Sequence, residues 1–297
     1  MSNLLARALT GLIAGSITVA LIVLSPWGLL AFCVIVSLLG LREFYQITGV
    51  AKAVTAYMIG VAAVIWAWFA IANLVPVDEV SPRSFVFFEL NWHVCAGIVF
   101  GVAAVISLFN YRGPAPVTEM GLVVLGAIYV FLPFVLLFMS GIDPMDYASS
   151  IRDPLASYGG LRADLYKFSI PLGILLLTWA LDVFAYFGGK YLGKHKLWER
   201  ISPKKTWEGA IIGALATMGL SVAFEMMWEQ HWSWLVVGGI IAVFSQLGDL
   251  VESMYKRGLQ LKDSGGILPG HGGILDRFDG LLITLPMIYL YIYASNF

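Results

Sequence analysis

Charged residues are scarce in this chain: only 12% of its 297 residues are Asp, Glu, Lys or Arg, against about 25% in soluble domains. Hydrophobic residues make up 59%. One soluble core of this length cannot bury that much apolar surface, so a lipid bilayer must cover much of it. The net charge of −1 offers no basic surface, which excludes a nucleic-acid partner.

Cysteine is nearly absent as well. Cys33 and Cys95 lie far apart, in or beside apolar runs. They form neither a metal-ligand motif nor a disulfide framework, and we interpret them as small packed hydrophobic residues. The chain also lacks internal repeats and low-complexity tracts.

Long apolar runs, by contrast, recur along the whole chain. Each approaches the ~20 residues that a helix needs to cross a bilayer. We place them at 8–25, 27–41, 55–75, 94–110, 117–140, 168–188, 209–229, 232–248 and 281–297. The sequence therefore predicts an all-α, polytopic transmembrane helix bundle of about nine helices. The first run follows Arg7 but has no convincing cleavage site, so we interpret it as an uncleaved helix.

The distribution of lysine and arginine predicts the orientation, because these residues concentrate in cytoplasmic loops. With a cytoplasmic N-terminus, all but four of the 18 lysines and arginines fall on the inner side. We therefore expect a cytoplasmic N-terminus, an outer C-terminus and a multi-pass protein of a bacterial-type cell inner membrane. Small-residue packing faces would permit a homodimer.

The two halves of the chain differ in chemistry. Region 1–167 combines transmembrane helices with polar outer loops and offers no candidate site. Region 168–297 is the expected catalytic transmembrane region, with cytoplasmic loops at 189–208 and 249–280 that combine cations, glycines and hydroxyls. Glycine lets backbone N–H groups approach an anion, and Lys or Arg neutralises it, so both loops are suited to phosphate.

Two acidic residues enter the last apolar run in the segment LDRFDG. Asp276 and Asp279 are three residues apart, so both lie on one face of a helix. Such carboxylates suit Mg²⁺, which takes one or two protein carboxylates and completes its shell with phosphate and water. The alternative is an acidic pair that complements the helix dipole.

Two further aspartates extend the acidic set. Asp249 starts a pattern with Glu252, Ser253 and Lys256 that lines one face if the preceding helix continues. Asp249 is either a metal- or phosphate-organising group or an interfacial charge. Asp182 lies inside an apolar run, where ionisable groups usually face a cavity or a partner. Both a direct role in a polar cavity and pairing with a cation remain open for it.

Polar donors gather at two other places. The segment ISPKKTWEG is either a phosphate clamp or a loop whose charge follows the positive-inside rule, and Thr206 can cap the next helix. His271, in LPGHGG, could donate to a phosphate or protonate a leaving group, or its partner could be the turn backbone.

The segment SMYKRGLQLKDSGGILPGHGGILDRFD, residues 253–279, closely resembles the signature of phosphatidate cytidylyltransferases, also called CDP-diacylglycerol synthases. That pattern is Ser, then Lys-Arg, Lys-Asp, a small-residue turn, His-Gly-Gly and DRxD at fixed offsets. SPKKTWEG and QLGDLVES also look like family segments, so the resemblance is strong over about 180–280.

The resemblance implies transfer of CMP from CTP to phosphatidic acid, giving CDP-diacylglycerol and pyrophosphate. It implies Mg²⁺ held by Asp249, Asp276 and Asp279, with a second metal ion left open. We expect catalytic roles for Asp249, Lys256, Arg257, Lys262, Asp263, His271, Asp276 and Asp279. We expect substrate binding by Asp182, Ser202, Lys204, Lys205, Thr206, Ser253, Gly272, Gly273 and Arg277.

Two other functions also combine membrane helices with acidic residues. A CDP-alcohol phosphotransferase carries a signature resembling DGxxAR, whereas DGLLIT here lacks the Ala-Arg pair. An ion-coupled transporter using Asp182 and Asp249 would typically show broken midplane helices or inverted repeats, and the sequence has no such symmetry.

Overall fold

The computed structural model describes residues 3–50, 61, 64, 116–141, 168–228, 230, 232–267 and 272–295. The predicted helices at 55–75, apart from residues 61 and 64, and at 94–110 lie outside the described residues, as does His271.

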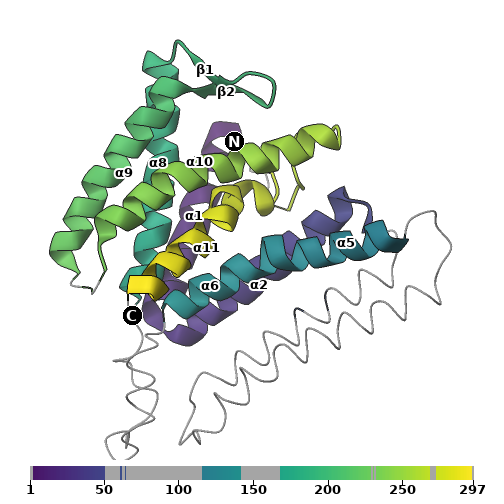
Figure 1. The fold of residues 1–297 in the computed structure, drawn as a ribbon, viewed down its shortest axis with the longest axis horizontal. Coiled ribbons are helices and arrows are strands. Elements are labelled where there is room, and N and C mark those ends of the chain that lie inside the picture. The colour runs from purple at the N-terminus through teal and green to yellow at the C-terminus, as the bar shows by residue number, and fades with distance from the viewer. Residues whose placement is uncertain are drawn as a thin grey trace, which may run out of the picture.

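Within the described residues the chain consists of helices and one short β-hairpin (Figure 1). The helices are α1 (Asn3–Leu24), α2 (Pro26–Ile47), α5 (Pro116–Gly126), the π-helical η2 (Ala127–Phe131), α6 (Leu132–Ser140), α8 (Ser169–Leu192), α9 (Trp207–Met227), α10 (Trp234–Gly258) and α11 (Leu275–Ser295). The hairpin pairs β1 (Lys196–Trp198) antiparallel with β2 (Ser202–Thr206).

Six helical segments of the described chain are long and apolar enough to cross a bilayer: Pro26–Ile47, Gly121–Ser140, Ser169–Leu192, Trp207–Met227, Trp234–Gly258 and Leu275–Ser295. They confirm the predicted all-α, polytopic membrane protein. The total of nine helices and the orientation of the two termini stay predictions.

The helix ends differ from the loop bounds that hydropathy predicted. Helix α10 runs on to Gly258 and α11 already begins at Leu275. The segment 249–280 is therefore helical at both ends, and its described non-helical residues are 259–267 and 272–274. Hydropathy falls where the charges begin, but Leu, Glu, Met, Lys and Arg are good helix formers, so the backbone continues as a helix. The segment 189–208 likewise holds the end of α8, the hairpin and the start of α9.

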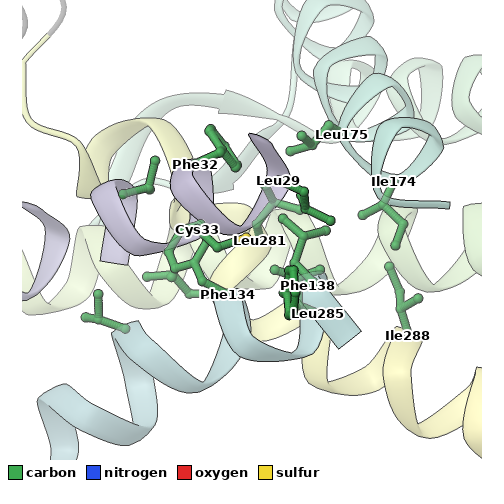
Figure 2. Close-up of a cluster of buried hydrophobic side chains, with 14 of the residues drawn as sticks. Leu29, Phe32, Cys33, Phe134, Phe138, Ile174, Leu175, Leu281, Leu285 and Ile288 are labelled. Carbon is green, nitrogen blue, oxygen red and sulfur yellow. The ribbon is translucent and has the colours of Figure 1, made fainter. Parts of the chain in front are cut away.

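Helices of the N-terminal half pack directly against those of the C-terminal half. Helix α10 packs against α8, α9 and α11, and α11 in turn packs against α6 and α2. Figure 2 shows where α2, α6 and α11 meet. Their buried side chains there include Leu29, Cys33, Phe134, Phe138, Leu281 and Leu285. This core sets the position of α11 relative to α2.

Helices α10 and α11 come unusually close at Gly248. A Cβ on Gly248 would lie 2.7 Å from the carbonyl oxygen of Asp279 and 3.0 Å from that of Gly280. Only glycine lets the two backbones approach this far. The crossing brings the charged end of α10 against the first turns of α11.

Candidate active site

Three aspartates from three helices form one acidic group, here called the open cluster: Asp182 of α8, Asp249 of α10 and Asp279 of α11. Asp182 repels Asp249, and both repel Asp279. Asp182 is exposed, and the Asp249 side chain is 32% exposed. Lys205 and Arg277 oppose this negative charge at Asp182. Helix α10 continues past residue 248, where the hydropathy predicted a loop, and this continuation carries Asp249 to its position beside Lys205.

The hairpin brings a basic residue to the open cluster. Lys205, near the end of β2, forms an ion pair with Asp249. Ser253, one turn further along α10, donates a hydrogen bond from its Oγ to Oδ1 of Asp249 at 3.2 Å. The two segments predicted to bind phosphate thus meet at one carboxylate.

Two side chains fix the hairpin to the start of α9. The buried Thr206 caps this helix, its Oγ1 accepting a hydrogen bond from the backbone N–H of Gly209 at 3.2 Å, as the sequence predicted. Glu208 accepts hydrogen bonds from the backbone N–H groups of Lys194 and His195 and lies 2.6 Å from the imidazole Nδ1 of His195. These contacts hold β1 and β2 beside the helix that carries Asp182.

A second group, here called the closed cluster, consists of Glu252, Lys256 and Asp276. Lys256 Nζ lies 2.9 Å from Glu252 Oε2 and 2.7 Å from Asp276 Oδ1. The Glu252 side chain is only 3% exposed, and those of Lys256 and Asp276 are each 10% exposed. Lys256 is thus enclosed between two carboxylates.

Asp276 also holds the connection between α10 and α11. Its Oδ2 accepts hydrogen bonds from the backbone N–H groups of Ser264 at 3.0 Å and Gly273 at 2.8 Å. Asp279, three residues further along α11, is hydrogen-bonded to Glu252 and is repelled by Asp249, so it contacts both clusters. Gly272, with φ of +81°, adopts the left-handed conformation that favours glycine.

The other predicted residues surround the two clusters. Arg257 donates hydrogen bonds to the carbonyl oxygens of Ile201 in the hairpin (3.4 Å) and Leu261 (3.2 Å). The remaining side chains at the surface are Lys204, Lys262, Asp263 and Arg277, which are exposed, and Ser202, which is half-buried. These cations are positioned to meet anions arriving at the end of α10.

The sequence prediction, which placed every candidate residue in the C-terminal half, did not include Glu43. This glutamate of α2 is completely buried, and its Oε2 accepts hydrogen bonds from the Leu275 backbone N–H at 3.0 Å and the Ser264 Oγ at 3.2 Å. The available signal was an acidic residue at the end of an apolar helix, where ionisable groups are costly. Its neighbour Arg42 made it resemble an ordinary interfacial charge.

The donors of the open cluster fit a hard divalent cation that is shared with substrate. Among the described residues, no three Asp, Glu, His or Cys side chains converge into a preassembled metal site. Mg²⁺ rarely uses such a site, because it commonly takes one or two carboxylates and fills its shell with phosphate oxygens and water. Asp249 and Asp279 offer that number. Both oxygens of Asp249 already have donors, Ser253 and Lys205, and one oxygen of Asp279 accepts from the Gly280 N–H. Both oxygens of Asp276 are also bound to protein donors.

Comparison with known proteins agrees with this geometry. The model of the cytidylyltransferase family matches residues 5–295 of the chain. The chain is 30% identical to the phosphatidate cytidylyltransferase of Bacillus subtilis (strain 168) over 296 residues, covering 97% of both proteins. It is 29% identical to that of Brucella melitensis biotype 1 over 293 residues, or 98% of this chain and 94% of the relative.

A shorter stretch is more similar still. Over 132 residues, 43% of this chain and 48% of the relative, it is 46% identical to the phosphatidate cytidylyltransferase of Staphylococcus epidermidis (strain RP62A). The resemblance inferred from the 253–279 signature is thereby confirmed. With a family match along nearly its whole length, the chain belongs to the cytidylyltransferase family.

Proposed function

We propose that this protein is a phosphatidate cytidylyltransferase, which transfers CMP from CTP to phosphatidic acid and releases pyrophosphate. The observation that carries the proposal is the open cluster with Lys205 at its edge. Three carboxylates on apolar helices and a cation come together there, and these are the residue types that a metal ion and a phosphate require. The names of the full-length relatives support the same reaction.

The chemistry requires charge neutralisation rather than a protein nucleophile. The phosphate of phosphatidate is largely anionic at neutral pH, so its oxygen can attack the α-phosphorus of CTP directly. One P–O bond forms there while the bond to the β-phosphate oxygen breaks, and pyrophosphate leaves with that oxygen. The obstacle is the repulsion between two polyanions, which fixed cations remove by neutralisation and in-line positioning.

The residues divide this work between them. Asp249 and Asp279 would hold Mg²⁺, which when bound supplies Lewis-acid stabilisation of the phosphate charge. Asp249 would exchange Ser253 or Lys205 for the metal, and Asp276 would join only by a similar exchange of one of its donors. Lys205 contacts substrate phosphate while remaining close to Asp249, and Arg257 and Lys262 bind the phosphates that extend past the end of α10. A second metal ion would use Asp182, which lies next to Asp249.

We further propose nine membrane spans with a cytoplasmic N-terminus in the inner membrane of a bacterial cell. The inner-side excess of lysine and arginine supports this orientation. CTP would then reach the site from the cytoplasm, while phosphatidate enters laterally with its acyl chains still in the bilayer. A homodimer would cover part of the exposed apolar surface of α8 and α9.

One assay tests the reaction: purified protein in detergent with CTP, phosphatidate and Mg²⁺. We expect CDP-diacylglycerol and pyrophosphate in equal amounts, dependent on all three additions. No reaction with CTP, together with release of CMP when a CDP-alcohol is supplied instead, would point to phosphotransferase chemistry. A folded protein that forms neither product would overturn the proposal.

A further inference from the structure

Glu43 has no role in the function proposed above, yet it is the most completely buried acidic residue in the described part of the chain. It comes from α2 and faces the connection between α10 and α11. Its Oε1 has no hydrogen-bond partner among the described residues. Burying a carboxylate in this way is costly, so its contacts with the connection need a reason.

The first contact caps a helix from outside. Leu275 is the first residue of α11, and its backbone N–H donates to Glu43 Oε2 at 3.0 Å. The first N–H groups of a helix have no partner within it, and an anion there also complements the helix dipole. A cap usually comes from the residue just before the helix, whereas here a carboxylate of another helix supplies it.

The second set of contacts encloses the carboxylate in the connection itself. Ser264 donates from its Oγ to Glu43 Oε2 at 3.2 Å. Gly265 and Gly273 lie so close that a Cβ on either one would collide with the Glu43 carboxylate. Because these two glycines of the family signature lack a Cβ, they leave room for a side chain of the N-terminal half.

Glu43 and Asp276 hold the same short segment from two sides. Ser264 gives its Oγ to Glu43 and its backbone N–H to Asp276, and Gly273 packs on Glu43 while donating to Asp276. Asp276 is bound in turn to Lys256. The position of Glu43 therefore determines where α11 begins and where Asp279 projects.

We propose that Glu43 is a positioning residue for cytidylyl transfer, because it locks the start of α11 so that Asp279 stays aligned with Asp249. The effect on catalysis rests on the proposed function, whereas the contacts that hold the start of α11 do not depend on it. A displacement of about 1 Å at a reacting centre can lower a rate about 100-fold. Loss of the Glu43 contacts can therefore lower the rate even though Glu43 does not touch the substrate.

The decisive experiment compares Glu43→Leu with Glu43→Gln in the full-length protein. Glutamine keeps one accepting oxygen at the same reach, and leucine keeps the volume but no acceptor. We expect Glu43→Leu to lower kcat about 100-fold with the KM for CTP within about threefold. Glu43→Gln should retain activity within about tenfold of the parent.

Hydrogen exchange in detergent, without substrate, gives a readout separate from activity. Glu43→Leu should speed amide exchange in peptides covering 261–275 and leave α8 and α9 unchanged. Cys33→Ala is the control, a buried change on the same helix that does not touch the connection. Faster exchange throughout the bundle, or Glu43→Leu with parental kcat, would overturn the clamp.

A glycine pair tests the same contact without altering Glu43. Gly265→Ala places its Cβ against the Glu43 carboxylate, whereas the Cβ of Gly266→Ala meets nothing within 4 Å. We expect only Gly265→Ala to reproduce the exchange and kcat changes of Glu43→Leu. Equal behaviour of the two alanine variants would contradict the proposal. A parent protein without cytidylyl transfer would refute the proposed function, while the exchange data would still decide the role of Glu43.

Discussion

The open and closed clusters share helices α10 and α11, with Asp182 of α8 added to the open one, yet their charges are balanced in opposite ways. Helix α10 supplies Asp249 to the open cluster and Glu252 and Lys256 to the closed one, and α11 supplies Asp279 and Asp276. In the closed cluster Lys256 lies between two carboxylates and almost nothing is exposed. In the open cluster three aspartates repel one another and Lys205 reaches them only from the edge.

This difference separates a structural from a chemical use of the same residue types. A buried ion pair whose partners are satisfied holds helices in register, whereas uncompensated carboxylates at an accessible site attract cations. We therefore propose that the closed cluster fixes the geometry and that the open cluster binds substrate and metal. Removing charge should consequently have opposite effects on stability in the two clusters.

The largest expected effect comes from neutralising the open cluster. Asp249→Asn or Asp279→Asn should each lower kcat on the order of 1,000-fold, the equivalent of several kcal/mol of lost charge stabilisation. Because each substitution also removes repulsion between carboxylates, the thermal unfolding midpoint should stay level or rise. Turnover and thermal unfolding measured on the same preparations check this. Near-parental turnover in both variants would mean that the open cluster is not the reaction centre.

Breaking the closed cluster should act on stability instead. Lys256→Met leaves Glu252 and Asp276 buried without a cation, which costs about 3–5 kcal/mol. The matched control is Lys205→Met, whose ion pair with Asp249 is partly exposed and should contribute at most about 1 kcal/mol to stability. Thermal unfolding and CTP titration distinguish the two. If Lys256→Met were fully stable but bound CTP weakly, Lys256 would be a phosphate ligand and the two clusters would not differ as described.

The sequence was sufficient for features that depend on neighbouring residues. The spacing of Asp249, Glu252, Ser253 and Lys256 predicted one face of a continued helix, and Thr206 was identified as a helix cap. Both are confirmed. Such features follow from local backbone geometry, which a single segment of sequence contains.

Features that depend on distant partners could not be predicted. Asp276 and Asp279 were expected to lie on one face of a helix, but three-residue spacing says nothing about which residues of another helix each side chain meets. Glu43 contacts Ser264 across 221 positions of sequence. No local pattern reveals such a pair, because it arises only when α2 packs against α11.

A smaller effect should follow from separating the two helices that both clusters share. Gly248→Ala places a Cβ against the carbonyl oxygens of Asp279 and Gly280, and overpacking of this kind costs about 1–3 kcal/mol. Asp249 and Asp279 should move apart, lowering kcat about tenfold. The control is Gly239→Ala on the same helix, whose Cβ meets nothing within 4 Å. It should stabilise α10 by up to about 1 kcal/mol, because alanine is the better helix former. Loss of stability in both variants would contradict close approach at Gly248.

The smallest expected effect concerns the edge of the open cluster, where the hairpin holds Lys205. Thr206→Ala removes the cap of α9, at a cost of about 1 kcal/mol in stability. Thr206→Ser keeps the hydroxyl and should behave like the parent. Since the cap joins β2 to α9, its loss should raise the KM for CTP a few-fold through Lys205 while kcat changes less. Steady-state kinetics of the two variants at saturating phosphatidate test this. If Thr206→Ala loses stability as expected but keeps the KM for CTP, the contact between Lys205 and Asp249 does not depend on the cap. The hairpin would then be rigid without its connection to α9.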